Sequence, residues 1–262
     1  MLLMKNALHI EYATKPHGRG LDKPNEDRLL VDKERGIFIV LDGVTRPHGE
    51  YEASPFESAA LDVGNIFLTE VYAYLCDHIS DQNPRKILEN AVRIANEKIY
   101  EYRQKKSADE WGFFPSTLGI ISILRGKTLH YLCVGDCIGV LIRYNSKIIF
   151  GRELTVKAVD LCQATKSERY ALYCNHPENH LSYTVFNGDD VVMDGVQYSF
   201  IDLHEGDILF LASDGIADYL KYEKAVDLVF KSPESIIGDS VRYDAPPFAS
   251  YADDKTLIKL QF

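Results

Sequence analysis

The sequence lacks the features that mark secreted and membrane-spanning proteins. Its 262 residues include five cysteines, an odd and scattered set, and no secretion signal is recognisable. Because disulfide-rich domains are typical of secreted proteins, we expect reduced thiols and a cytoplasmic location. The apolar start at residues 1–4 stops at Lys5, which is far too short for a signal-peptide core or a membrane span.

Basic residues are also outnumbered by acidic ones. The chain carries 29 basic and 39 acidic residues, which gives a net charge of −10. Proteins that bind nucleic acid or anionic membranes present an excess of basic charge. We therefore expect neither as a partner. We expect a monomer whose acidity contributes mainly to solubility.

Internal repeats, low-complexity tracts and Pro/Gly/Ser linkers are absent, so we predict a single domain over residues 1–262. Strands come first, two helices follow, and strands then resume. This order predicts an α+β fold with helices packed outside antiparallel sheets.

The expected elements follow from hydrophobic periodicity and from capping signals. Two helices should begin at Ser54-Pro55 and Asn83-Pro84, each a capping residue followed by proline, and a third should cover residues 217–230. Residues 155–194 show no clean period and are interpreted as a long flap beside the site. Strands are expected at residues 8–13, 28–31, 36–41, 117–124, 128–134, 138–143, 197–203, 208–211 and 256–262.

Acidic residues stand at the ends of apolar strands. Asp42, Asp136 and Asp214 each follow such a run, and Asp253 precedes the last one. Any one of these acids taken alone is better explained by a turn, because Asp-Gly pairs suit turns. As a set they predict a metal site, since acids on neighbouring strands would converge and repel unless a cation neutralised them. Carboxylate oxygens suit Mg²⁺ or Mn²⁺.

Other chemistry has little support in the sequence. The eight histidines show no metal-binding spacing, and Ser116-Thr117 lacks the context of a nucleophile. Cys133 and Cys137 have no partners at zinc-finger spacing and are interpreted as packing residues. We therefore expect no covalent catalysis.

Taken in order, these segments resemble the metal-dependent serine/threonine protein phosphatases, the PPM or type-2C family, in a divergent bacterial-type form. The resemblance covers nearly the whole chain, and the segment around Asp214 is its most specific part. The matching motifs are Asn25-Glu26-Asp27, Phe38-Ile39-Val40-Leu41-Asp42-Gly43, Pro115-Ser116-Thr117-Leu118-Gly119, Val134-Gly135-Asp136, Leu211-Ala212-Ser213-Asp214-Gly215-Ile216-Ala217-Asp218 and Asp253-Asp254-Lys255-Thr256.

The resemblance implies a four-layer αββα sandwich with two central antiparallel sheets and a metal site at one end between them. It also implies a hydrolase that removes phosphate from phosphoserine and phosphothreonine in proteins, in signalling, by attack of a metal-activated water. The metal ligands that it implies are Asp42 bridging two ions, the Gly43 carbonyl, Asp214 and Asp253 at the first ion, Glu26 at the second, and Asp136 with Asp214 at a third. Asp42, Asp214 and Asp253 would be the catalytic residues.

The chain departs from the family pattern where the substrate would bind. Val44-Thr45-Arg46 replaces the family's His-Gly-Gly, and Asp22 stands where the family has its phosphate-binding arginine. We predict that Lys23 takes that role first and Arg46 second, although solvated surface cations would explain both. Two other functions stay open. One is a phosphatase-like regulatory or binding module with little turnover, and the other is a phosphatase of a small phosphorylated metabolite.

Overall fold

The computed structural model describes residues 8–16, 24–44, 59–106, 115–151, 175, 184–190, 192–244 and 253–262. Its strands form two five-stranded antiparallel sheets, with the orders β1-β10-β9-β6-β7 and β2-β3-β4-β5-β8. The strands are β1 (His9–Lys15), β2 (Arg28–Asp32), β3 (Ile37–Gly43), β4 (Thr117–Arg125), β5 (Thr128–Val134), β6 (Ile138–Arg143), β7 (Ser146–Phe150), β8 (Gln197–Asp202), β9 (Ile208–Ala212) and β10 (Lys255–Gln261).

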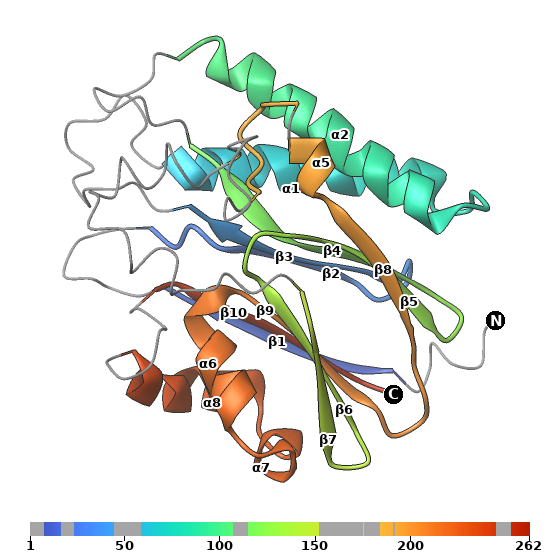
Figure 1. Cartoon of the computed structure of the whole chain (residues 1–262), viewed down its shortest axis with the longest axis vertical. Coiled ribbons are helices and arrows are strands. Elements are labelled where there is room, and N and C mark those ends of the chain that lie inside the picture. The colour runs from blue at the N-terminus through green and yellow to red at the C-terminus, as the bar shows by residue number, and fades with distance from the viewer. Residues whose placement is uncertain are drawn as a thin grey trace.

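Helices cover the outer face of each sheet (Figure 1). Helices α1 and α2 contact β3, β4 and β5 of one sheet, and α8 contacts β1 and β10 of the other. The helical segments are α1 (Ala59–His78), α2 (Pro84–Arg103), α5 (Val192–Gly195), α6 (Ala217–Tyr222), α7 (Ala225–Val229) and α8 (Pro233–Ser240), with 3-10 turns η1 (Asp214–Ile216) and η2 (Val241–Tyr243). The predicted αββα sandwich is confirmed. None of the described helices is both long and apolar enough to cross a membrane.

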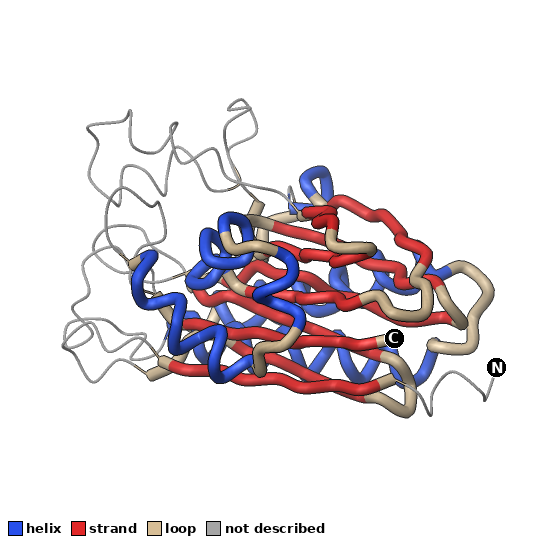
Figure 2. The backbone as a smooth tube through the Cα atoms, turned by 90° about the horizontal axis from the view of Figure 1, so that it is seen from below, coloured by secondary structure: helices blue, strands red, loops and turns tan. Residues whose placement is uncertain are grey.

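The central position of the sheets explains the continuous apolar runs in the sequence. In β3, the side chains from Ile37 to Leu41 are all fully buried, because one face of the sheet meets helices and the other meets the second sheet. Figure 2 shows the strands running side by side, with the helices lying across them. Such strands hold their ends rigidly, which is what positions the residues that follow them.

Several local predictions match the structure. Strands β5 and β6 have the predicted bounds. Helix α2 begins as predicted, since the Asn83 side chain accepts a hydrogen bond of 3.1 Å from the Lys86 backbone N–H and Pro84 occupies the first turn. The predicted start of the preceding helix at Ser54 lies outside the described residues.

The prediction of one helix over residues 217–230 is wrong. The chain is extended at Glu223 and Lys224, with ψ angles of 149° and 144°, which separates α6 from α7. The Lys147 ammonium donates to the Leu220 carbonyl at 3.0 Å and the Glu223 carbonyl at 2.6 Å. Because Lys147 lies on β7, a strand that we did not predict, a distant contact ends α6. Helix α8 was also not predicted, although Ser232 caps its start.

Part of the predicted flap, residues 155–194, is described at residues 175, 184–190 and 192–194. Phe186 pairs with Thr117 at the start of β4, and its ring stacks on that of Phe67 at 4.3 Å between centroids. The Arg103 guanidinium donates to the Asp189 carboxylate at 2.7 Å. The C-terminal part of this region is therefore anchored to the first residue of β4 and to the end of α2.

Candidate metal centre

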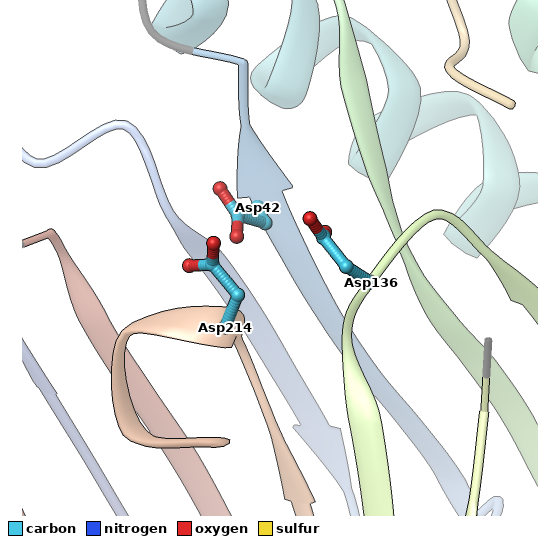
Figure 3. Close-up of side chains that lie close together, drawn as sticks. All are labelled: Asp42, Asp136 and Asp214. Carbon is cyan, nitrogen blue, oxygen red and sulfur yellow. The ribbon is translucent and has the colours of Figure 1, made fainter. Parts of the chain in front are cut away.

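Three of the predicted acids converge between the sheets. Asp42 lies near the end of β3, Asp136 lies in the connection from β5 to β6, and Asp214 opens η1 directly after β9. One carboxylate oxygen of each lies within 4.8 Å of those of the other two. Figure 3 shows the three side chains pointing toward one another from separate segments. The strand ends thus bring together acids that are far apart in the sequence.

Burial and mutual repulsion raise the pKa values of all three carboxyl groups. For Asp42 the pKa is raised first by burial and then by the charges of Asp214 and Asp27. For Asp214 burial again dominates, followed by the charges of Asp136 and Asp253, while a hydrogen bond with Asp42 opposes the shift. For Asp136 burial and then Asp253 raise the pKa to about 6. Without a cation, this group of acids therefore favours protonated forms.

Two further predicted ligands, Glu26 and Asp253, are among the described residues. Asp253 precedes β10, and its charge raises the pKa values of Asp42, Asp136 and Asp214. Glu26 is 1% exposed and lies just before β2. Neither Glu26 nor Asp253 belongs to the set of described residues whose oxygens share the 4.8 Å group. Lys23 and Arg46, the predicted phosphate-binding residues, lie outside the described residues.

Two glycines allow the acid-bearing segments to approach each other. A Cβ on Gly43 would lie 2.6 Å from the Cβ of Glu26, and a Cβ on Gly215 would lie 2.2 Å from the Asp254 carbonyl oxygen. Neither glycine has a positive φ. The turn explanation therefore does not account for these Asp-Gly pairs. Glycine is needed because a second backbone passes directly beside each acid.

A buried hydroxyl connects three of these segments. The Ser213 hydroxyl donates to the Asp27 carboxylate at 2.7 Å and accepts a hydrogen bond of 3.0 Å from the Thr256 backbone N–H. The Glu26 backbone N–H donates to the Asp254 carboxylate at 2.7 Å. These bonds tie the segment before β2 to the end of β9 and to the start of β10, and so position the acids on each.

Asp27 is a buried acid that the sequence analysis did not single out. It is 3% exposed, and burial raises its pKa to about 7, with the Ser213 hydrogen bond opposing and the Asp254 charge adding to the shift. The available signal was its place next to Glu26 in an acidic motif. Lys255 was likewise missed as a supporting residue. Its buried ammonium donates to the Gly215 carbonyl at 2.8 Å and to the Asp244 carboxylate at 2.6 Å.

The start of β4 fixes the backbone beside Asp42. The Thr117 hydroxyl donates to the Asp42 carbonyl at 2.8 Å, and the Val44 backbone N–H donates to the Ser116 carbonyl at 3.0 Å. Ser116 and Thr117 therefore act as structural supports, in line with the absence of a nucleophile context. Cys133 and Cys137 are buried, and the Cys133 thiol donates to the Cys137 carbonyl at 3.6 Å, as expected for packing residues.

Comparisons with known proteins show similarity in structure. No protein-family model matches the sequence, and the search of curated proteins gave no match. The serine/threonine phosphatase PstP from Mycobacterium tuberculosis has 18% identity and a TM-score of 0.67, with 97% of this chain and 98% of that chain covered. The PstP catalytic domain in complex with 2 manganese ions has 17% identity and a TM-score of 0.67, covering 97% of each chain.

A third structure extends the likeness to another bacterial enzyme. The PPM Ser-Thr phosphatase MsPP from Mycobacterium smegmatis, in complex with cacodylate, has 18% identity and a TM-score of 0.62, with 97% of this chain and 98% of that chain covered. Similarity at this level of identity, over nearly the full length of both chains, establishes the architecture. The chain has the fold of the bacterial PPM serine/threonine phosphatases.

Proposed function

We propose that this protein is a metal-dependent phosphomonoester hydrolase of the PPM type that dephosphorylates phosphoserine and phosphothreonine in proteins. The observation that carries the proposal is the convergence of Asp42, Asp136 and Asp214 within 4.8 Å, between the two sheets of this fold. The motifs at Asn25-Glu26-Asp27 and Asp253-Asp254-Lys255-Thr256 support it, since both match the family pattern.

The chemistry of the donors fits Mn²⁺ or Mg²⁺. The group offers carboxylate oxygens alone, which hard divalent cations prefer. Burial and neighbouring acids raise the pKa values of Asp42 and Asp214, so a cation would relieve a repulsion that the fold builds in. The 2 manganese ions in the PstP structure are a property of that protein and agree with this choice. We assign the ions to the set Glu26, Asp42, Gly43, Asp136, Asp214 and Asp253.

In the proposed mechanism the protein mainly positions the metal ions and the phosphate and neutralises the charge of the phosphate oxygens. Asp42, Asp136 and Asp214 would hold divalent ions, which would lower the pKa of a bound water and neutralise the phosphoryl oxygens. Asp42 and Asp214 are held at rigid strand ends, so their oxygens need little reorganisation when a phosphomonoester binds. We assign the orientation of the outer phosphate oxygens to Lys23 and then Arg46, since a phosphate dianion needs a cation beside it.

The two alternatives make different demands on these residues. A regulatory or binding module has no need of the acids, and the retention of Asp42, Asp136 and Asp214 as one group favours an enzyme. A small phosphorylated metabolite stays open as a substrate, because the loop at residues 44–50 departs from the family pattern. We propose a phosphoprotein substrate and a monomeric, cytoplasmic enzyme. Cys76, Cys133 and Cys137 form no disulfide with one another in the described part of the chain, which supports a reducing compartment.

The test is hydrolysis of p-nitrophenyl phosphate and of phosphoserine and phosphothreonine peptides, with Mn²⁺, Mg²⁺ or a chelator. We expect activity with either ion and none with the chelator. Asp214→Asn should lower activity by at least about 100-fold, because losing even a supporting residue of a metal site costs 10–100-fold. Full activity in chelator, or activity restored only by Zn²⁺, contradicts the proposal. Mn²⁺ binding without hydrolysis indicates a binding module, and hydrolysis of the small ester alone indicates a metabolite substrate.

A further inference from the structure

The residues on both sides of Asp214 are bonded to the start of β10. On one side, the Ser213 backbone N–H donates to the Thr256 carbonyl at 3.1 Å, and the Thr256 backbone N–H donates to the Ser213 hydroxyl at 3.0 Å. On the other side, the Lys255 ammonium donates to the Gly215 carbonyl at 2.8 Å. The first two bonds follow directly on the pairing of β9 with β10, whereas the third is made by a buried charged side chain.

The Gly215 carbonyl lies where the helical path is interrupted. The backbone at Ile216, with φ −125° and ψ 6°, is not helical and separates η1 from α6. Gly215 is buried, and a buried carbonyl that has no hydrogen-bond donor destabilises a fold. The Lys255 ammonium supplies that donor. The peptide plane one residue beyond Asp214 therefore takes its orientation from a side chain of β10.

Asp244 holds the ammonium in this position. Its carboxylate accepts a hydrogen bond of 2.6 Å from the Lys255 ammonium, and the side chains of Asp244 and Lys255 are only 9% and 3% exposed. Asp244 follows η2 directly, so the ion pair joins the end of η2 to the start of β10. An ammonium that is confined between a carboxylate and a carbonyl has a fixed direction, and Asp244 balances its charge.

A second lysine of β10 provides a comparison within the same protein. Lys259 lies four residues after Lys255 on the same face of the strand, and both residues are 2% exposed. The Lys259 ammonium donates to the carbonyls of Val229 at 3.0 Å and Lys231 at 2.8 Å, and it lies 3.5 Å from the Glu11 carboxylate. The two lysines share strand, burial and kind of partner, but Lys255 bonds the neighbour of a predicted metal ligand and Lys259 bonds the end of α7.

We propose that Lys255 is a positioning residue of the metal centre, which holds Asp214 in place for divalent ions through the Gly215 carbonyl. Losing a residue that orients a metal ligand typically costs about 10–100-fold in metal affinity. The sign of the effect identifies its cause. A positive charge near acids repels a divalent ion, so losing the charge of Lys255 alone would tighten ion binding, whereas losing its bond to Gly215 weakens it. This inference rests on the proposed metal site.

The test compares two matched pairs of variants of the full-length protein. Lys255→Met and Lys255→Met/Asp244→Asn both remove the bond to Gly215, and the double variant keeps the net charge and leaves neither partner of the ion pair charged. Lys259→Met and Lys259→Met/Glu11→Gln make the corresponding changes at the second lysine. Mn²⁺ binding is measured by calorimetry, and thermal unfolding is measured in chelator.

Both Lys255 variants should bind Mn²⁺ about 10–100-fold more weakly than the parent, whereas both Lys259 variants should bind it as the parent does. In chelator the Tm should fall in Lys255→Met and Lys259→Met, because each leaves a carboxylate without its partner, and it should recover in part in the double variants. A difference in Mn²⁺ affinity between variants that lose similar stability therefore comes from the position of Asp214. If Lys255→Met does not fold, the double variant gives the same comparison.

The proposal is overturned if the Lys255 variants bind Mn²⁺ as the parent does or more tightly. It is also overturned if the Lys259 variants lose as much Mn²⁺ affinity as the Lys255 variants, since the loss would then follow from general destabilisation. If the parent itself binds no Mn²⁺, the proposed function fails together with this inference.

Discussion

Replacing Asp136 by asparagine should stabilise the metal-free protein at neutral pH. Burial, followed by the charge of Asp253, raises the pKa of Asp136 from 3.8 to about 6, with Lys221 opposing. An acid whose pKa is higher in the folded state than in the unfolded state makes the folded protein bind more protons between those two values. Its contribution to the free energy of unfolding therefore falls as the pH rises from about 4 to about 6, and stays low above that. Asparagine removes this loss because it does not ionise.

The size of the effect follows from the shift. About two pKa units at 1.36 kcal/mol per unit set an upper limit of about 3 kcal/mol at pH 7.5. The Asp136 side chain is partly exposed, and it titrates together with Asp42 and Asp214, so solvent screening and coupling reduce this to about 1–2 kcal/mol. For a chain of this size, that corresponds to a rise in Tm of about 2–6 °C.

The assay is thermal unfolding of Asp136→Asn and parent in chelator at pH 7.5 and pH 4.5. Glu205→Gln, at an exposed turn between β8 and β9, removes one negative charge elsewhere and is the control. The gain of Asp136→Asn should shrink by more than half at pH 4.5, where Asp136 is protonated in the folded state. An unchanged or lower Tm at pH 7.5 would refute the reasoning, as would an equal gain at both pH values. In saturating Mn²⁺ the Tm of the parent should rise more than that of Asp136→Asn.

Three further predictions test the site. Asp253→Asn should remove most hydrolysis and leave the fold intact by circular dichroism, and turnover at the parent rate would show that the site is misplaced. Ser213→Ala should weaken Mn²⁺ binding about 10–100-fold, whereas Ser122→Ala, which removes another buried hydroxyl, should not, and equal Mn²⁺ affinities would exclude a positioning role. Lys23→Ala, and then Arg46→Ala, should raise the KM for a phosphomonoester several-fold with unchanged Mn²⁺ affinity. Unchanged kinetics in both variants would eliminate these cations.

The sequence by itself determined the elements that local chemistry controls. The bounds of β5 and β6 follow from apolar residues between turn residues, and the start of α2 follows from an asparagine cap and a proline. The position of Asp42 and Asp214 at strand ends was also visible, because an apolar run followed by an acid is a local pattern. These features depend on neighbours within a few residues, so one sequence suffices to predict them.

The tertiary structure alone decided which distant groups meet. Helix α6 ends where it does because Lys147 reaches it from another strand, although the residues beyond α6 have a helical pattern. The same holds for the approach of Gly215 to the Asp254 backbone and for the bond from Ser213 to Asp27. Contacts between residues so far apart along the chain depend on the packing of whole layers, and local propensity carries no information about them.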